Sequence, residues 1–190
     1  YINKNTAELR MNMKAIENRK SIRKYKDQPI DEKLLLEIIR NASLAPSGNN
    51  TQPWNFIIVD NLESRKEISI VCHNQKWMNT APVFIVCVAD INCRIKETEK
   101  INLDEETSLF ELKQIIRDTA ISIEHLVIEA TEQGLGTCWV AWYEQKEIRP
   151  LLGIPNDKFV VGVITIGYSD EHPKQRPRKN IEDIIHRNRW

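Results

Sequence analysis

One segment of this chain, residues 114–133, is too apolar all round for a helix that lies on a surface. Gly134 follows it in the position where helices commonly end, and a helix of this length would span about 30 Å. A helix that is wet on one side needs only a single apolar stripe. We therefore expect burial on two sides, by the chain's own sheet and by either a partner subunit or the rest of a single-chain core. The apolar positions are Ile115, Ile116, Ala120, Ile121, Ile123, Leu126, Val127, Ile128 and Ala130.

The surrounding sequence alternates between helical and strand patterns. Asp31 can cap a helix that ends near Ser43. Ile30 and Leu35 are placed as a hydrophobic staple around that cap. Residues 82–89 are apolar without alternation, which is typical of a strand buried on both faces. Further helices are predicted at residues 13–18, 62–71 and 144–152, and further strands at residues 54–59, 136–142 and 159–166.

Length and composition favour one soluble domain. The chain has 190 residues, of which 41% are hydrophobic and 28% charged, enough for a single core. We place this domain at residues 11–190, with residues 1–10 as an extension before it. Residues 90–108 show mixed charge and little periodicity, as in a lid or a mobile connection. No run reaches the roughly 18 apolar residues of a membrane span, and the start lacks a secretory signal, so we expect a cytoplasmic protein with no membrane partner.

No metal centre, catalytic triad or Rossmann fold is indicated. The four histidines are scattered, and no GxGxxG fingerprint opens a strand-to-helix turn. The cysteines form no CxxC pair and have no histidine at zinc-ligand spacing, so we expect reduced, mostly buried thiols. They are Cys72, Cys87, Cys93 and Cys138.

Charge is balanced overall but uneven along the chain. The 27 basic and 27 acidic residues cancel, which argues against a nucleic-acid partner. Residues 14–26, however, hold six basic residues against one acidic, and residues 174–189 hold six against two. Two basic clusters at opposite ends of a neutral chain predict one local anion site.

The first basic cluster contains the string RKSIR. In an extended segment Arg19, Ser21 and Arg23 point the same way, because side chains alternate with a period of two. Guanidinium forks and a hydroxyl suit phosphate oxygens, to which each charge-assisted hydrogen bond contributes roughly 1.5–3 kcal/mol. Taken alone, such a basic run is more typical of solvated surface.

A second string, PSGNNTQPW at residues 46–54, predicts a fixed polar loop before a strand. Its prolines and glycine restrict the backbone, while Ser47, Asn50 and Gln52 offer hydrogen-bond donors and acceptors. Such groups can bind the edge of a flat heteroaromatic ring. On composition alone, an ordinary polar turn before a strand is the favoured interpretation of the segment.

The exact strings resemble the nitroreductase family of FMN-dependent oxidoreductases. RKSIR and PSGNNTQPW match its opening signature, GLGTCWV at residues 134–140 a later one, and PKQR at residues 173–176 its closing phosphate-binding stretch. The strings occur in the expected order and cover nearly everything from Met13 to Trp190. The resemblance implies an α+β fold, with a mixed, mostly antiparallel sheet flanked by helices, and an intertwined homodimer with two FMN sites at the subunit interface.

The resemblance also implies roles for particular residues. Arg23 would lie nearest the flavin ring and stabilise its reduced form, and Asn74 either binds the ring or is a plain surface residue. Arg19, Lys20, Ser21 and Arg23 would contact the FMN phosphate, ribityl chain and pyrimidine edge, with Lys174 and Arg176 completing the phosphate site. The residues that would border the flavin from the other subunit are Pro46, Ser47, Gly48, Asn50 and Gln52.

One departure from the family pattern concerns the substrate face. Many members have Gly-Gly after CWI or CWV, whereas this chain has Ala141 and Trp142. Backbone donors survive a change of side chain, so FMN binding need not fail. Trp142 would either narrow the substrate face or pack outward from the strand, in alternation with Val140.

The implied activity is hydride transfer from NADH or NADPH through FMN to a small oxidised acceptor, such as a nitroaromatic or a quinone, with ping-pong kinetics. FMN carries the redox chemistry, so no catalytic side chain is expected. The alternatives are other flavin chemistry on the same fold, namely reductive dehalogenation or flavin fragmentation, and a flavin-binding protein without turnover.

Overall fold

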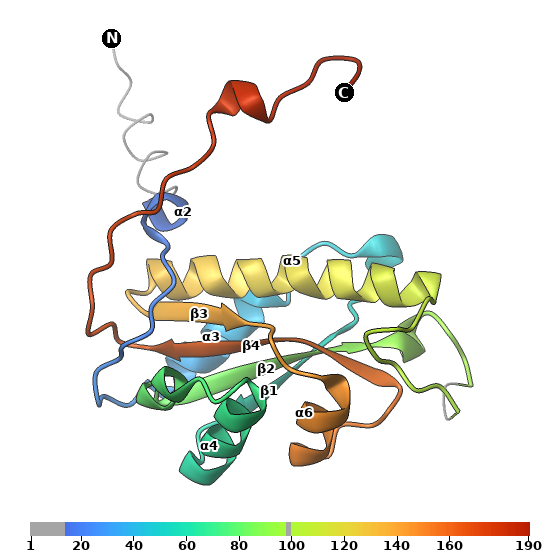
Figure 1. The fold of residues 1–190 in the computed structure, drawn as a ribbon, viewed down its shortest axis with the longest axis horizontal. Helices are drawn as coiled ribbons and strands as arrows, with labels where there is room; N and C mark the ends of the chain where they lie inside the picture. The colour runs from blue at the N-terminus through green and yellow to red at the C-terminus, as the bar shows by residue number, and fades with distance from the viewer. Residues whose placement is uncertain (1–13, 98–99) are drawn as a thin grey trace.

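A four-stranded sheet forms the centre of the molecule (Figure 1). The structure, a computed structural model, describes residues 14–97 and 100–190, so the expected extension at residues 1–10 lies outside it. A parallel bridge joins Ser21 to Thr137 at one edge, and the remaining pairing of neighbours is antiparallel, which confirms the mostly antiparallel sheet. The strands, in spatial order, are β1 (Trp54–Val59), β2 (Val83–Asp90), β4 (Lys158–Gly167) and β3 (Gly136–Val140).

Helices cover both faces of the sheet (Figure 1). β2 is buried along its whole length except at Asp90, as the non-alternating run predicted, because Ile85 faces one helical layer and Phe84 the other. The helices of the first layer are α3 (Glu32–Ala42) and α5 (Phe110–Glu132), those of the second are α4 (Leu62–Val71) and α6 (Gln145–Leu151), and the short α2 (Lys14–Asn18) contacts α5.

The start of α3 follows the predicted capping pattern. The carboxylate of Asp31 accepts a hydrogen bond from the backbone N–H of Leu34 at 3.2 Å. Leu35 is buried and Ile30 half-buried in the same core, so the hydrophobic staple is confirmed. The helix ends at Ala42, and its last turn leads directly into the polar loop.

α5 begins at Phe110, four residues before the predicted start. The residue that precedes it, Leu109, has no side chain able to cap the first turn, so the sequence carried no start signal there. Leu112 in this added turn is buried in the core. The chain's own sheet and α3 cover only part of α5, since Ile121 is 37% exposed and Phe110 is 66% exposed.

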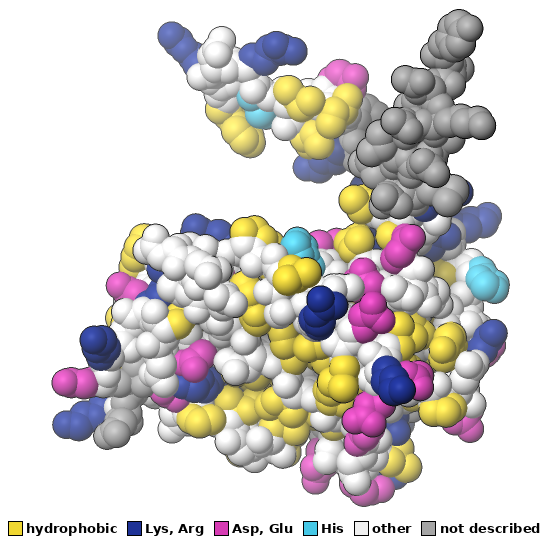
Figure 2. All heavy atoms as spheres, turned by 180° about the vertical axis from the view of Figure 1, so that it is seen from behind, with side chains coloured by type: hydrophobic (Ala, Val, Ile, Leu, Met, Phe, Trp, Pro, Cys, Tyr) yellow, Lys and Arg dark blue, Asp and Glu magenta, His cyan; other side chains and the backbone are white. Residues whose placement is uncertain are grey.

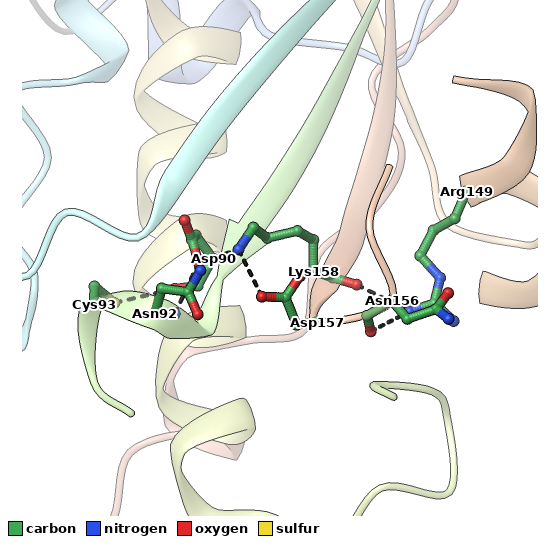
Figure 3. A network of polar contacts seen from close by, with 7 residues as sticks. All are labelled: Asp90, Asn92, Cys93, Arg149, Asn156, Asp157 and Lys158. Atoms are coloured by element: carbon green, nitrogen blue, oxygen red, sulfur yellow. Dashed lines mark hydrogen bonds and ion pairs between the residues drawn. The ribbon is translucent and has the colours of Figure 1, made fainter. Parts of the chain in front are cut away.

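The connection between β2 and α5 is fastened to the body of the protein, in contrast to the predicted lid or mobile connection. Ile91 and Leu103 are fully buried, and the Leu103 N–H donates to the carbonyl of Asn156 at 2.9 Å. An ion pair between Lys158 and Asp90 joins the nearby ends of β2 and β4, and Lys158 also pairs with its neighbour Asp157 (Figure 3). The sequence did not predict this attachment, because an irregular segment has no hydrophobic periodicity that would indicate which of its residues are buried.

Candidate functional site

The segment that follows α2 runs along the edge of the sheet beside β3. The backbone N–H of Ile22 donates to the carbonyl of Thr137 at 2.9 Å, and the Ile22 side chain is buried against Gly136. A Cβ at Gly136 would lie only 2.7 Å from Cγ1 of Ile22, so this close approach requires glycine. Ile22 is turned inward, whereas Arg19, Ser21 and Arg23 line one cavity, as the alternation predicted.

Tyr25 fixes this segment from inside the core. Its hydroxyl donates to the carbonyl of Ile22 at 2.7 Å and shares a hydrogen bond with the Thr165 hydroxyl at 2.8 Å. Burial raises the pKa of Tyr25 well above its ordinary value, so the hydroxyl stays protonated and able to donate. A backbone bridge from Tyr25 to Ser169 then joins the segment to the chain that leaves β4.

The two basic clusters meet in one cleft. Figure 1 shows the N-terminal segment and the chain after β4 side by side along the same edge of the molecule. Together they enclose a cavity of about 140 Å³, and none of the described residues that line it is acidic. We call this cavity the basic cleft; its residues are Arg19, Lys20, Ser21, Arg23, Pro173, Lys174, Gln175, Arg176 and Arg178.

The basic cleft contains all six residues that were predicted to contact the phosphate, the ribityl chain or the pyrimidine edge of FMN from this chain. It also contains Arg178, which the motifs did not single out, although it belongs to the second basic cluster. Six cationic side chains in one small cavity repel one another, and an anion with two charges relieves that repulsion. The donor set of guanidinium, ammonium and hydroxyl groups matches a phosphate.

Arg23 extends the basic cleft toward a neighbouring turn. Its guanidinium carbon lies 5.7 Å from the ring centre of Trp77, within the range of a cation–π contact. Its backbone N–H donates to the carboxylate of Glu171. Arg23 therefore stands where the cleft opens toward the turn between α4 and β2.

That turn contains Asn74, and it meets Trp142, which lies two residues beyond the end of β3. Asn74 is exposed with a φ of 55°, and the preceding His73 has a φ of 58°. The His73 ring contacts the Trp142 ring, with 3.8 Å between the ring centres and an angle of 39° between the ring planes. β3 ends at Val140, two residues earlier than predicted, so Trp142 does not alternate with Val140 along a strand. It stands free of the sheet, 66% exposed, with His73 on one side.

The polar loop, residues 46–52, lies elsewhere in the same chain. None of its described residues lines the basic cleft. Asn50 and Gln52 are exposed with positive φ angles of 54° and 47°, while the Ser47 hydroxyl accepts a hydrogen bond from the Gln52 N–H at 3.0 Å. The structure of one chain thus brings the phosphate-type residues together and leaves Pro46, Ser47, Gly48, Asn50 and Gln52 apart from them.

The described residues offer no support for a metal centre, a membrane span or a reactive buried thiol. Residues 14–97 and 100–190 hold no cluster of histidine, cysteine and carboxylate side chains suited to a metal ion. No described helix combines the length and apolarity needed to cross a membrane. Three cysteines are buried, and burial raises the pKa of Cys72 to about 12, so this thiol stays protonated.

Comparisons with known proteins relate the chain to one family. Residues 16–168 match the model of the Nitroreductase family. A Bacillus subtilis protein named as an FMN reductase that uses NAD(P)H is 27% identical over 92% of this chain and 72% of its own. A nitroreductase family protein from Clostridium novyi is 32% identical, with a TM-score of 0.70 over 86% of this chain and 87% of its own. NfrA2 from B. megaterium is 27% identical, with a TM-score of 0.84 over 95% of this chain and 75% of its own.

Proposed function

We propose, because this chain belongs to the Nitroreductase family, that it is an FMN-dependent oxidoreductase. It would take hydride from NADH or NADPH and pass it, in ping-pong order, to a small oxidised acceptor such as a nitroaromatic or a quinone. The observation that carries the proposal is the basic cleft, in which the two ends of the chain assemble a phosphate-type donor set.

The residues of the basic cleft fit the phosphate end of FMN. The cavity of about 140 Å³ is well below the roughly 300–1,000 Å³ of a complete ligand pocket, so it accommodates the phosphate and leaves the ring outside. Arg19, Lys174 and Arg176 would hold the phosphate. Arg23, at the open end beside Trp77, would stabilise negative charge on the pyrimidine edge of the ring. When bound, FMN supplies the hydride chemistry, and the protein supplies position and electrostatics.

We propose a homodimer in which a second copy completes each site. The polar loop does not reach the basic cleft of its own chain, so its ring-binding groups are free to serve a second copy. Residues 174–190, the C-terminal arm, are exposed throughout. Lys174, Arg176 and Arg178 line the basic cleft, and Figure 2 shows the end of the arm beyond them standing clear of the body. Its side chains Ile181, Ile184 and Ile185 are more than half exposed. An arm with such apolar groups in water is typical of an interaction segment.

The visible absorption spectrum of the purified protein tests FMN binding. We expect a yellow protein whose flavin stays bound through gel filtration and is identified as FMN after release by heat. A colourless protein that also fails to take up added FMN would show the proposal to be wrong. Product analysis with halogenated and nitro-substituted aromatics then separates hydride transfer from dehalogenation or flavin fragmentation.

Trp142 should restrict the acceptor to small flat molecules. The Trp142→Ala variant is expected to raise kcat/KM for two-ring quinones by roughly tenfold relative to one-ring quinones, because pocket contacts of this size contribute about 1–3 kcal/mol to discrimination. Steady-state assays with benzoquinone and naphthoquinone measure the ratio. Trp139→Ala is the matched control, since Trp139 lies on β3 over Gly162. An equal ratio in wild type and Trp142→Ala would remove Trp142 from the substrate face.

A further inference from the structure

An ion pair that no sequence motif indicated lies between the polar loop and α5 and contacts the loop. Nη2 of Arg94, just after β2, lies 3.0 Å from Oδ2 of Asp118, in the middle of α5. The two side chains are only 13% and 11% exposed. They lie 24 residues apart in the sequence, within different elements.

Both backbone groups of Gly48 bind to this ion pair. Its N–H donates to Oδ2 of Asp118 at 3.1 Å, and its carbonyl accepts a hydrogen bond from Nη2 of Arg94 at 3.3 Å. A Cβ at Gly48 would lie 2.7 Å from Nη2 of Arg94, so glycine is what allows the ion pair to reach the backbone. The three groups close a triangle that ties the loop to α5.

The loop needs such support because its backbone is strained. Asn49, Asn50 and Gln52 all have left-handed φ angles, of 54°, 54° and 47°. Asparagine adopts this conformation more readily than most residues, whereas for Gln52 it costs about 1–2 kcal/mol and persists only where the surroundings hold it. Besides the internal hydrogen bonds of the loop, the contacts of Gly48 with Arg94 and Asp118 tie it to the body of the protein.

The ion pair itself is a poor source of stability. Removing two charges from water is costly, and an apolar pair of similar volume commonly stabilises a fold as well or better. In addition, Nε of Arg94 is buried and has no hydrogen-bond partner among the described residues, which adds a desolvation cost. We therefore interpret the ion pair between Arg94 and Asp118 as a means of fixing the conformation of the polar loop rather than as a source of stability.

We propose that Arg94 and Asp118 are positioning residues for the FMN ring, acting through Gly48. They would hold Asn50 and Gln52 of one copy in the conformation that faces the flavin bound by the other copy. This inference rests on the proposed FMN function and dimer. It extends the site to two residues that touch neither phosphate nor ring.

Flavin binding with and without the phosphate separates this role from that of the basic cleft. We expect Asp118→Ala to weaken the binding of FMN and of riboflavin alike, by roughly tenfold, because the loop contacts the ring that both ligands share. Asp118→Asn keeps an acceptor for the Gly48 N–H and should recover part of the loss. Gly48→Ala removes no buried charge, but its Cβ would lie 2.7 Å from Nη2 of Arg94 and displace that side chain from the loop. It should therefore weaken the binding of both flavins in the same direction if Asp118→Ala folds poorly. Flavin fluorescence titrations measure both ligands.

Asp157→Asn is the matched control for a lost ion pair. Asp157 and Lys158 are 14% and 16% exposed, close to the burial of Asp118 and Arg94, and belong to the network of Figure 3. This variant should lose stability in urea and keep its flavin affinity. Folded Asp118→Ala and Gly48→Ala variants that bind both flavins like wild type would overturn the positioning role. A wild-type protein that binds neither flavin would instead remove the proposed function.

Discussion

The wild-type protein is expected to bind FMN roughly a hundredfold more tightly than riboflavin, and the Arg19→Ala/Arg176→Ala variant should lose most of that preference. Two charge-assisted hydrogen bonds to the phosphate, at about 1.5 kcal/mol each, account for a difference of this size. Riboflavin lacks the phosphate, so its affinity should be the same in both proteins. Fluorescence titration of each flavin against each protein gives the four dissociation constants.

The control for this experiment removes a cation outside the basic cleft. Lys66 is exposed on α4 and pairs with Glu63, a contact of small energetic value. Lys66→Ala should leave both dissociation constants unchanged. Equal affinity of the wild type for FMN and riboflavin would mean that the basic cleft does not hold the phosphate, whatever else the protein binds.

The second large effect is the recovery of activity in a mixed dimer. One variant, Arg19→Ala/Arg176→Ala, has a defective basic cleft, and the other, Asn50→Gly/Gln52→Gly, has a defective polar loop. Glycine keeps the left-handed backbone accessible while removing the side chains. Each variant alone should be nearly inactive. If the loop acts across the interface of a symmetric dimer, their heterodimer contains one intact and one doubly defective site, and should show about half of the wild-type activity.

Two affinity tags, one on each variant, allow the heterodimer to be purified after co-expression. A heterodimer of wild type with the cleft variant also keeps one intact site. Its activity is the reference for a dimer with one working site. A mixed heterodimer as inactive as its parents would contradict the shared site, because it would place cleft and loop of one site on the same chain. A monomer by light scattering at micromolar concentration would contradict the dimer itself.

Features that depend on neighbouring residues in the sequence were predictable. The cap at Asp31 and the buried run of β2 follow from local patterns, and the structure confirms both. α5 was predicted too short because Leu109 carries no capping group, and β3 too long because apolar residues continue past Val140 into the turn that holds Trp142.

The candidate site was predictable only in part, for a related reason. Residue type and charge marked Arg19 and Arg176 as anion-binding, and the resemblance to a family joined the two ends of the chain around one ligand. The ion pair between Arg94 and Asp118 has no sequence signature, because its partners belong to different elements and meet only through the packing of α5 against the polar loop. A single arginine or aspartate in a sequence is most often a surface residue, so neither Arg94 nor Asp118 could be singled out.

Anaerobic titration of the FMN-loaded protein with NADH and with NADPH tests the central claim most directly. We expect at least one of the two nicotinamides to bleach the visible flavin band completely, at one equivalent per bound FMN, and a quinone added afterwards to restore it. A flavin band that persists with excess of both nicotinamides would contradict the account and leave a flavin-binding protein without turnover.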